Sequence, residues 1–294
     1  MIKYHLNSDV ERICDKSFVI TGSARSGTTI LGKVVHSMRE VEYNFEPASM
    51  LSLFSMIDNM DIDSWKFLYR NILYEELLIN NLAGRGLNCN LQDDSSIYKV
   101  KTQKFIDDRL NKGKRKAEMK QLIDTSIPGF KLPSLVPFLE QFRMYFPNIK
   151  VVYIRRSILD NLNSLKNKAW FSDEGLKNDN RIWPLVKYKK YYIPFWVAEN
   201  DYDLWTSLDE INRCAYYFIR MNRKVEIPNL LELEYDRVLK SPKKEIEKVA
   251  AFIGATFGDK TNELINSIKP TKNNRDTHLL NQLIPRFQAV LKSV

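Results

Sequence analysis

The stretch SFVITGSARSGTTIL, residues 17–31, decides the fold. Its first residues form a short apolar run that ends at Gly22, as a buried strand does. After Gly27, apolar residues recur at helical spacing as far as Met38. A strand that passes through a glycine-containing turn directly into a helix is the first half of a strand–helix–strand unit. Residues 17–38 therefore predict one such half-unit.

Two further stretches repeat this pattern. The apolar run at 149–154 precedes the sequence Ser157-x-x-Asp160, which is typical of a helix N-terminus. Residues 230–235 alternate like a strand, and the following pair Ser241-Pro242 predicts the start of a helix that Gly254 ends. Strands that alternate with helices favour an α/β fold with a central parallel sheet flanked by helices.

Residues 51–120 and 166–225 are predicted to be helical and irregular, and we interpret them as insertions that carry an acceptor pocket or a lid. No linker rich in proline, glycine or serine divides the chain, and no internal repeat is present. We therefore expect one domain over residues 1–294, with the three-layer architecture of P-loop NTPases and helical insertions.

Composition excludes disorder on the scale of the chain, because 44% of the 294 residues are hydrophobic and 12% are aromatic. The net charge is +9, and residues 99–120 alone hold nine Lys or Arg against three acids. That basic run is either a solvated face or a contact for an anionic ligand. Charge alone does not distinguish a nucleic acid from a nucleotide or a sulfated glycan.

Cysteines and histidines are too few and too scattered for a disulfide framework or a structural zinc site, so no metal is expected. The three cysteines are Cys14, Cys89 and Cys214. The first residues lack the apolar core of a signal peptide, and no run of about 18 apolar residues occurs. A cytoplasmic location is the expectation.

The turn between the first strand and helix has the features of an anion cradle. Successive backbone N–H groups and about half a positive charge at the helix N-terminus converge there. Gly22 and Gly27 permit the tight turn, and Arg25 adds a guanidinium group. Hydroxyl donors come from Ser26, Thr28 and Thr29. An ordinary polar turn is the alternative.

The loop nearly matches the Walker pattern GxxxxGK(S/T), but Thr28 stands where that pattern has lysine. A kinase or ATPase uses that lysine on the β- and γ-phosphates. Because the cation has moved to Arg25, the loop favours a nucleotide that lacks a γ-phosphate and binds without magnesium.

These residues carry a resemblance. The segment GSARSGTTIL resembles the 5′-phosphosulfate loop of sulfotransferases, in which the pattern is G-x-P-R-S-G-T-T-x-L, and Ala24 departs from it at the usual proline. Residues 151–164, VVYIRRSILDNLNS, resemble the 3′-phosphate strand and helix of that family, with Arg156 and Ser164 at its eight-residue spacing. The family's Asp-Pro after the arginine is absent here.

A third stretch, LELEYDRVLKSP at 231–242 followed by AFIG at 251–254, is similar to a late segment of the same family. The three matches follow in family order from residue 17 to residue 254.

The resemblance implies transfer of a sulfuryl group from 3′-phosphoadenosine 5′-phosphosulfate to an acceptor hydroxyl or amine. Arg25 and Thr28 would hold the 5′ end of this donor, and Arg156 and Ser164 its 3′-phosphate. Arg275 would belong to a late basic loop that closes over that phosphate, although the loop's usual glycine is missing.

The resemblance also indicates catalytic residues. Glu46, in the sequence YNFEP at 43–47, matches the F-E-P element of carbohydrate sulfotransferases and is the candidate base. Lys131 resembles a lysine at a neighbouring strand end that faces the transferring group. The alternatives are a surface glutamate and a solvated turn lysine.

Other readings stay open. An ATP-dependent P-loop kinase, a basic nucleic-acid-binding protein and an inactive nucleotide-binding relative are the alternatives, although no nucleic-acid-binding motif is present. The F-E-P element favours a sugar acceptor, as do aromatic residues that could stack on sugar rings, although each could equally be a core residue. The tryptophans concerned are Trp170, Trp183, Trp196 and Trp205.

Overall fold

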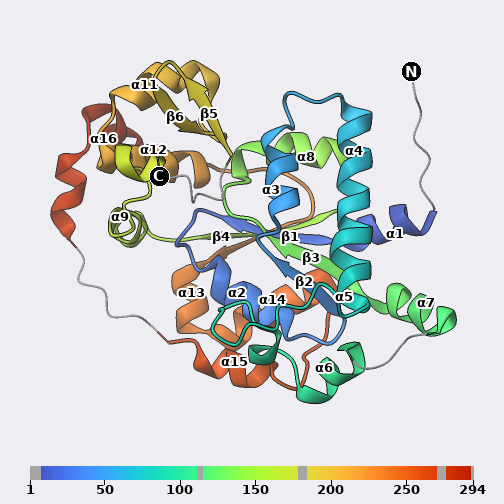
Figure 1. Ribbon diagram of the computed structural model, residues 1–294. Helices are drawn as coiled ribbons and strands as arrows, with labels where there is room; N and C mark the ends of the chain where they lie inside the picture. The colour runs from blue at the N-terminus through green and yellow to red at the C-terminus, as the bar shows by residue number, and fades with distance from the viewer. Residues whose placement is uncertain (1–7, 111–114, 178–183, 270–275, 293–294) are drawn as a thin grey trace.

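The computed structural model describes residues 8–110, 115–177, 184–269 and 276–292. Its centre is a five-stranded, wholly parallel sheet with the strand order β2-β3-β1-β4-β7 (Figure 1). The strands are β1 (Phe18–Gly22), β2 (Val41–Phe45), β3 (Ile127–Lys131), β4 (Lys150–Arg155) and β7 (Leu230–Glu234). This sheet confirms the predicted α/β class.

Strand β1 lies in the middle of the sheet, and all five of its residues are buried. Both of its faces are therefore covered, which explains why its sequence is continuously apolar instead of alternating. Because all strands are parallel, the loops that follow β1, β2, β3 and β4 emerge at one edge of the sheet. The predicted site residues lie in those loops or next to them, except Ser164, which lies in the helix after β4, and Arg275, which lies outside the described residues.

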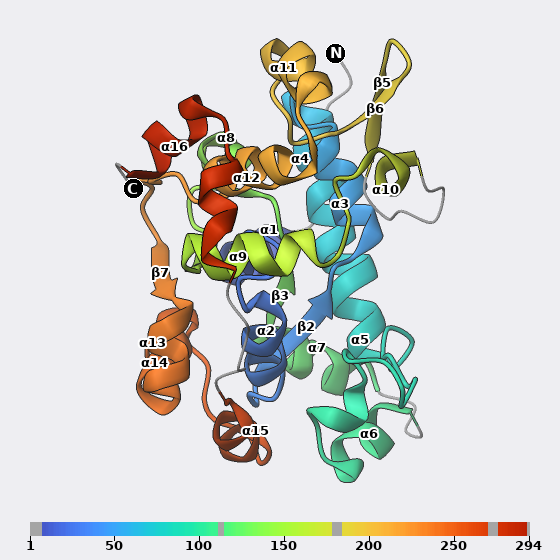
Figure 2. The ribbon, with the colours of Figure 1, turned by 90° about the vertical axis from the view of Figure 1, so that its left-hand side faces the viewer.

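Helices cover both faces of the sheet, which gives the three layers expected (Figures 1 and 2). One face carries α2 (Thr28–His36), α13 (Tyr235–Lys240), α14 (Pro242–Ile253) and α15 (Thr261–Ser267). The other face carries the larger core and packs α1 (Ser8–Lys16), α8 (Leu139–Tyr145), α9 (Ile158–Lys166), α12 (Glu210–Met221) and the π-helix η1 (Ile72–Ile79).

The first insertion is helical, as predicted. It contains α3 (Ala48–Ser55), α4 (Ile62–Asn71), η1, α5 (Asn80–Leu82), the 3-10 turn η2 (Ile97–Lys99), α6 (Gln103–Leu110) and α7 (Lys116–Thr125). The short turn η3 (Val136–Phe138) precedes α8.

The second insertion differs from the prediction, because it contains an antiparallel hairpin as well as helices. Its elements are α10 (Asp173–Lys177), β5 (Leu185–Tyr188), β6 (Tyr191–Pro194), η4 (Glu199–Asp201), α11 (Tyr202–Ser207) and α12. The hairpin turns at Lys189, whose φ is 54°. The sequence gives no clear signal for it, because the turn pair Lys189-Lys190 lacks the glycine, asparagine or aspartate that is typical of two-residue hairpin turns. The chain ends with η5 (Thr277–Gln282) and α16 (Pro285–Lys292).

Two predicted helix boundaries are confirmed. Helix α14 has Ser241 as its N-cap residue and Pro242 as its first residue, and Gly254 ends it in the left-handed region with φ 84°. Helix α9 has Ser157 as its N-cap residue, and the Ser157 hydroxyl donates a hydrogen bond to Asp160 at 2.8 Å. These local signals place the helix that follows β4 and the second helix after β7, whereas α13 directly after β7 was not predicted.

The basic run at 99–120 is only partly a solvated face. The ammonium group of Lys101 is buried and donates to the carbonyl oxygen of Met38 at 2.5 Å. Burial lowers the pKa of Lys101 to about 8. Arg109 is also buried, in an ion pair of 2.6 Å with Glu42. These two cations stabilise the edge of the sheet, whereas Lys104, Arg115, Lys116 and Lys120 are exposed.

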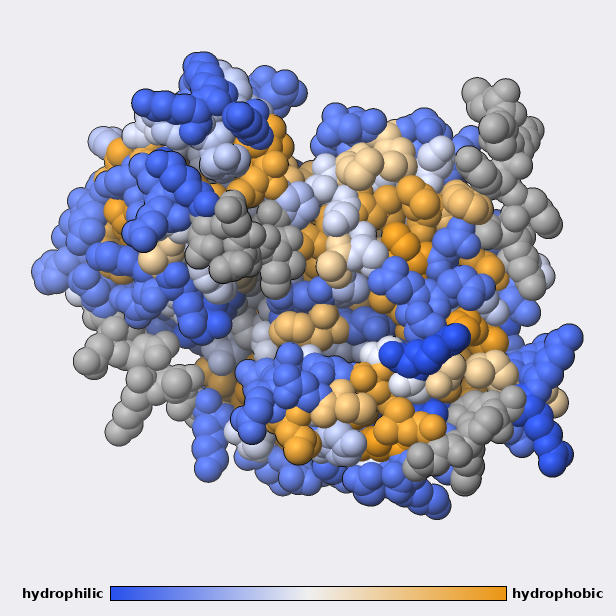
Figure 3. All heavy atoms as spheres, in the orientation of Figure 1, coloured by the Kyte–Doolittle hydropathy of each residue, from blue (hydrophilic) through white to orange (hydrophobic). Residues whose placement is uncertain are grey.

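Apolar surface is visible over α3 and α4, at the upper right of Figure 3. Met56, Ile62 and Leu68, which lie in or next to these helices, are exposed. Within the described ranges, no helix combines the length and the apolar character needed to cross a bilayer.

Candidate functional site

The loop after β1 has a backbone that only glycine permits at two positions. A Cβ atom on Gly22 would lie 2.3 Å from the carbonyl oxygen of Ile154, and one on Gly27 would lie 2.2 Å from the ring of Tyr235. Gly27 also has a φ of 95°. It is the N-cap residue of α2 and has no side chain with which to cap it. The first N–H groups of α2 have no acceptor inside the helix and are therefore suited to an anion.

Two buried residues that the sequence analysis did not identify hold this loop. The hydroxyl of Tyr217, on α12, accepts a hydrogen bond from the N–H of Ala24 at 2.7 Å and lies 2.8 Å from the Ser134 hydroxyl. The amide of Asn161, on α9, donates to the Ser23 hydroxyl at 3.0 Å and to the Ala24 carbonyl at 2.9 Å. The sequence hinted at such an acceptor only through Ala24. The family usually has proline at that position, which has no N–H group, whereas the N–H of alanine needs an acceptor.

Ser26 and Thr28 are buried in the loop, and the hydroxyl of Ser26 is already used. Both the N–H and the hydroxyl of Ser26 donate to the carbonyl of Ser23, at 3.2 and 2.6 Å. Ser26 therefore shapes the turn. Its predicted contact with a ligand through the hydroxyl would need that bond to change.

The structure brings Arg25, Ser164 and Arg156 together, although they come from two distant stretches. The Arg25 Nε donates to the Ser164 hydroxyl at 3.0 Å, and the Arg156 Nη1 donates to the Arg25 carbonyl at 2.8 Å. The Arg156 guanidinium lies 5.0 Å from the centroid of the Tyr235 ring. Tyr235 thus contacts both the loop glycine and this arginine, a role that the sequence analysis did not assign.

One atom of this cluster has no partner. The Nε of Arg156 is buried and makes no hydrogen bond within the described part of the chain. A buried donor without an acceptor is unfavourable, so an anion at this position would be stabilised. Arg275, the remaining predicted residue of the donor site, lies outside the described residues. The neighbouring Asp276 is placed beside α9, where its N–H donates to Asn163 at 3.1 Å.

A second cluster joins the ends of β2, β3 and the start of α2. The ammonium of Lys131, 1% exposed, lies 2.6 Å from the Glu46 carboxylate and donates to the Thr29 hydroxyl at 3.0 Å. The Lys131 Nζ also lies 3.9 Å from the centroid of the Phe45 ring. Burial lowers the pKa of Lys131, while the Glu46 carboxylate opposes that shift and Arg25 adds to it. Lys131 is therefore a buried residue of the cluster and not a solvated turn residue.

Glu46 has a φ of 46°, which is unusual for a residue with a side chain. Its N–H donates to the carbonyl of Lys131 at 3.0 Å, so the chain turns away from the sheet while still paired with β3. About a third of the Glu46 side chain is exposed. A carboxylate that is held by a lysine and still reaches solvent is well placed to accept a proton from a bound ligand.

The tryptophans of the second insertion, residues 166–225, supply less of the acceptor site than their sequence indicated. Trp196 and Trp205 are each 1% exposed and pack against one another, with ring centroids 5.3 Å apart. They are core residues. Trp170 is half-buried against the same core, and Trp183 lies outside the described residues. No group of three or more metal-ligating side chains occurs in the described ranges.

A scan against protein families matches residues 17–259 to the sulfotransferase family. A search of curated proteins finds no match. Solved structures that resemble this one include a sulfotransferase from Alicyclobacillus acidocaldarius, with 13% identity, a TM-score of 0.42 and coverage of 94% of this chain and 92% of the other.

The sulfotransferase domain of the curacin biosynthetic pathway shares 16% identity, with a TM-score of 0.41 and coverage of 89% and 81%. A retinol dehydratase solved with androsterone and the inactive cofactor PAP shares 14%, with a TM-score of 0.31 and coverage of 95% and 79%. The family match covers both clusters described above, and so this chain belongs to the sulfotransferase family and is a sulfotransferase.

Proposed function

We propose that this enzyme transfers a sulfuryl group from 3′-phosphoadenosine 5′-phosphosulfate to an acceptor hydroxyl, by in-line displacement. The observation that carries the proposal is the hydrogen-bonded group of Arg25, Ser164 and Arg156 beside the uncapped N-terminus of α2. It joins the loop that would hold the 5′ end of the donor to the helix that would hold the 3′-phosphate.

The residues of this region fit a donor with about four negative charges. Gly22 and Gly27 let the Ile154 carbonyl and the Tyr235 ring pack directly against the loop, and the first N–H groups of α2 have no acceptor inside the helix. The buried Nε of Arg156, which has no partner among the described residues, provides a donor for a second anionic group. Arg25, which is exposed, bonds to Ser164 between the two positions.

When bound, the donor supplies the activated sulfuryl group. The side chains of the second cluster would act on it and on the acceptor. Glu46 accepts the proton that the acceptor hydroxyl loses as its oxygen bonds to sulfur. Lys131, 2.6 Å from Glu46, fixes the direction of that carboxylate. With Arg25 and the N-terminus of α2, the Lys131 ammonium also stabilises the charge that develops on the departing phosphate oxygen.

A metal is not required by this arrangement, because Arg25, Lys131 and the helix N-terminus lie where a metal would otherwise neutralise charge. The acceptor itself is proposed to be a carbohydrate or another small hydroxyl compound, on the basis of the F-E-P element at residues 45–47.

Thermal unfolding in the presence of adenosine 3′,5′-bisphosphate or ATP–Mg²⁺ tests the donor. We expect the bisphosphate to raise the melting temperature of the wild type, and Arg156→Ala to abolish that effect. Arg155→Ala is the matched control, because Arg155 is the preceding residue and pairs with Glu232 at 2.9 Å instead. Stabilisation by ATP–Mg²⁺ alone would show a P-loop kinase and contradict the proposal.

A further inference from the structure

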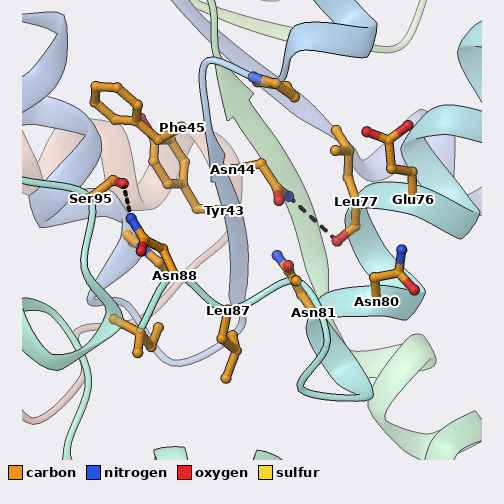
Figure 4. A pocket seen from close by; sticks show the side chains of 14 residues that line it. Tyr43, Asn44, Phe45, Glu76, Leu77, Asn80, Asn81, Leu87, Asn88 and Ser95 are labelled. Carbon is orange, nitrogen blue, oxygen red and sulfur yellow. Dashed lines mark hydrogen bonds between the residues drawn. The ribbon is translucent and has the colours of Figure 1, made fainter. Parts of the chain in front are cut away.

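A polar cavity of about 360 Å³ lies beside the edge strand β2, and none of the roles above uses it (Figure 4). Four asparagines, Asn44, Asn80, Asn81 and Asn88, line it, and we call it the amide pocket. Its walls come from β2, from the end of η1 with α5, and from the loop that leads to η2. A cavity of this volume is large enough for a sugar-sized group.

The amide pocket adjoins the proposed catalytic cluster. Phe45 and Pro47, the two neighbours of Glu46, both line it. The Phe45 ring is also the ring that lies 3.9 Å from the Lys131 ammonium. A molecule in the pocket would therefore be next to the strand end from which Glu46 projects.

One asparagine of the lining has a polar atom without a hydrogen-bond partner among the described residues. Asn81 is 2% exposed, and its Oδ1 accepts no hydrogen bond from the described residues. Its amide points toward Asn44 across the pocket in Figure 4. The lack of a side chain at Gly86 makes room for the Asn81 amide, because a Cβ atom on residue 86 would lie 2.3 Å from the Asn81 Oδ1. A ligand that supplies a hydroxyl group would stabilise the Asn81 Oδ1.

The charge of the lining restricts the ligand further. Glu76 is its one carboxylate among the described residues, and none of the described lining residues is a lysine or arginine. Burial lowers the pKa of His36 to about 3, so this imidazole is neutral at pH 7. An anionic group would be repelled by Glu76 and would find no cation. A purely apolar group would leave the Asn81 Oδ1 without a partner.

The backbone beside the pocket is also unusual. Glu76 and Leu77 project from η1, which is a π-helix over Ile72–Ile79. The Leu77 carbonyl accepts a long hydrogen bond of 3.5 Å from the Asn44 amide (Figure 4). π-Helices are rare and occur frequently at functional sites.

We infer that the amide pocket binds the non-reacting part of the acceptor, and that this part is an uncharged, polyhydroxylated group such as a neutral sugar or polyol. This inference rests on the proposed sulfuryl transfer, because it takes Glu46 as the neighbouring base. Beyond the proposed function, the inference names the residues that select the acceptor and predicts that acidic sugars are excluded from the pocket.

Saturation-transfer NMR tests it, with and without adenosine 3′,5′-bisphosphate. The probes are methyl glucoside, methyl galactoside, N-acetylglucosamine and myo-inositol, compared with glucuronate and 2-naphthol. We expect at least one neutral probe to bind the wild type and glucuronate not to bind. The variant Asn81→Leu should weaken that neutral probe about tenfold or more.

Asn222→Leu is the matched control. Asn222 is also a buried asparagine with an unpartnered Oδ1, but it lies at the end of α12 and does not line the pocket. It should leave probe binding unchanged. Glu76→Gln, at an exposed position, provides a variant that is expected to fold and should allow glucuronate to bind.

Three results would overturn the inference: no neutral probe binds, 2-naphthol binds in preference, or Asn81→Leu binds the probe as the wild type does. Binding of the bisphosphate distinguishes a failure of this inference from a failure of the proposed function. If it stabilises the protein while the sugars fail, the acceptor assignment alone is wrong. If sugars bind but the bisphosphate does not, the donor assignment is wrong.

Discussion

Replacement of Tyr217 by phenylalanine removes one oxygen atom from behind the donor loop. In the structure this hydroxyl accepts from the Ala24 N–H at 2.7 Å and lies 2.8 Å from the Ser134 hydroxyl, with Tyr217 fully buried. The change leaves a buried N–H without an acceptor, which costs about 1–3 kcal/mol. We therefore expect the free energy of unfolding in urea to fall by that amount.

The same change should weaken binding of the donor product. If the loop is less ordered in the free variant, binding must supply the free energy that orders it. When this amounts to about 1 kcal/mol, the dissociation constant of adenosine 3′,5′-bisphosphate rises about fivefold. Isothermal titration calorimetry measures this directly. Tyr216→Phe is the control, because the adjacent Tyr216 hydroxyl bonds to Asp201 at 2.8 Å, in the second insertion.

The control should lose stability and keep its affinity for the bisphosphate. If Tyr217→Phe also kept wild-type affinity while it lost as much stability as Tyr216→Phe, the reasoning that this hydroxyl positions the loop would be refuted.

Three other substitutions test separate parts of the account. Gly27→Ala should destabilise the protein by about 1–3 kcal/mol and abolish bisphosphate binding, because the added Cβ would lie 2.2 Å from the Tyr235 ring. Gly254→Ala should retain binding, because residue 254 is also at positive φ but an added Cβ would come no closer than 3.9 Å to Lys150. Lys131→Met should lower turnover about 100-fold while bisphosphate affinity changes far less, and equal losses in both would contradict its role in the reaction. The pKa of His36 is lowered to about 3 in the folded protein, so as the pH falls below about 6.5 the unfolded chain takes up a proton at this residue and the folded protein does not. The free energy of unfolding should therefore be about 2 kcal/mol lower at pH 5 than at pH 7. His36→Gln should remove this difference in urea titrations at the two pH values, and an unchanged difference would refute the role of His36.

The sequence predicted those parts of the fold whose signals are local. Strand β1, helix α2 and the ends of α14 follow from apolar spacing, glycine and proline positions. The residue pattern did not identify strand β3, and only the resemblance placed Lys131 at a strand end, because the sequence IPGFK contains proline and glycine, which are typical of turns. Its Gly129 is required by the neighbouring Phe18 ring, which lies 2.2 Å from where a Cβ would be.

The candidate site was predictable only where residues stand in one motif. Arg25, Arg156 and Ser164 could be named from the resemblance to the family's motifs, whereas their direct hydrogen bonds depend on the order of the strands. Asn161 lies within a stretch that the sequence analysis singled out, but a buried amide has no sequence signal. The tryptophans show the opposite case, since composition does not tell a core ring such as Trp205 from a binding surface.

The central claim is tested most directly by comparing the affinities of adenosine 3′,5′-bisphosphate and 5′-AMP, which differ only in the 3′-phosphate. We predict that the wild type binds the bisphosphate at least about tenfold more tightly, and that Arg156→Ala binds both with similar affinity. Equal affinity of the wild type for the two nucleotides, or a preference that survives in Arg156→Ala, would contradict the donor site described here.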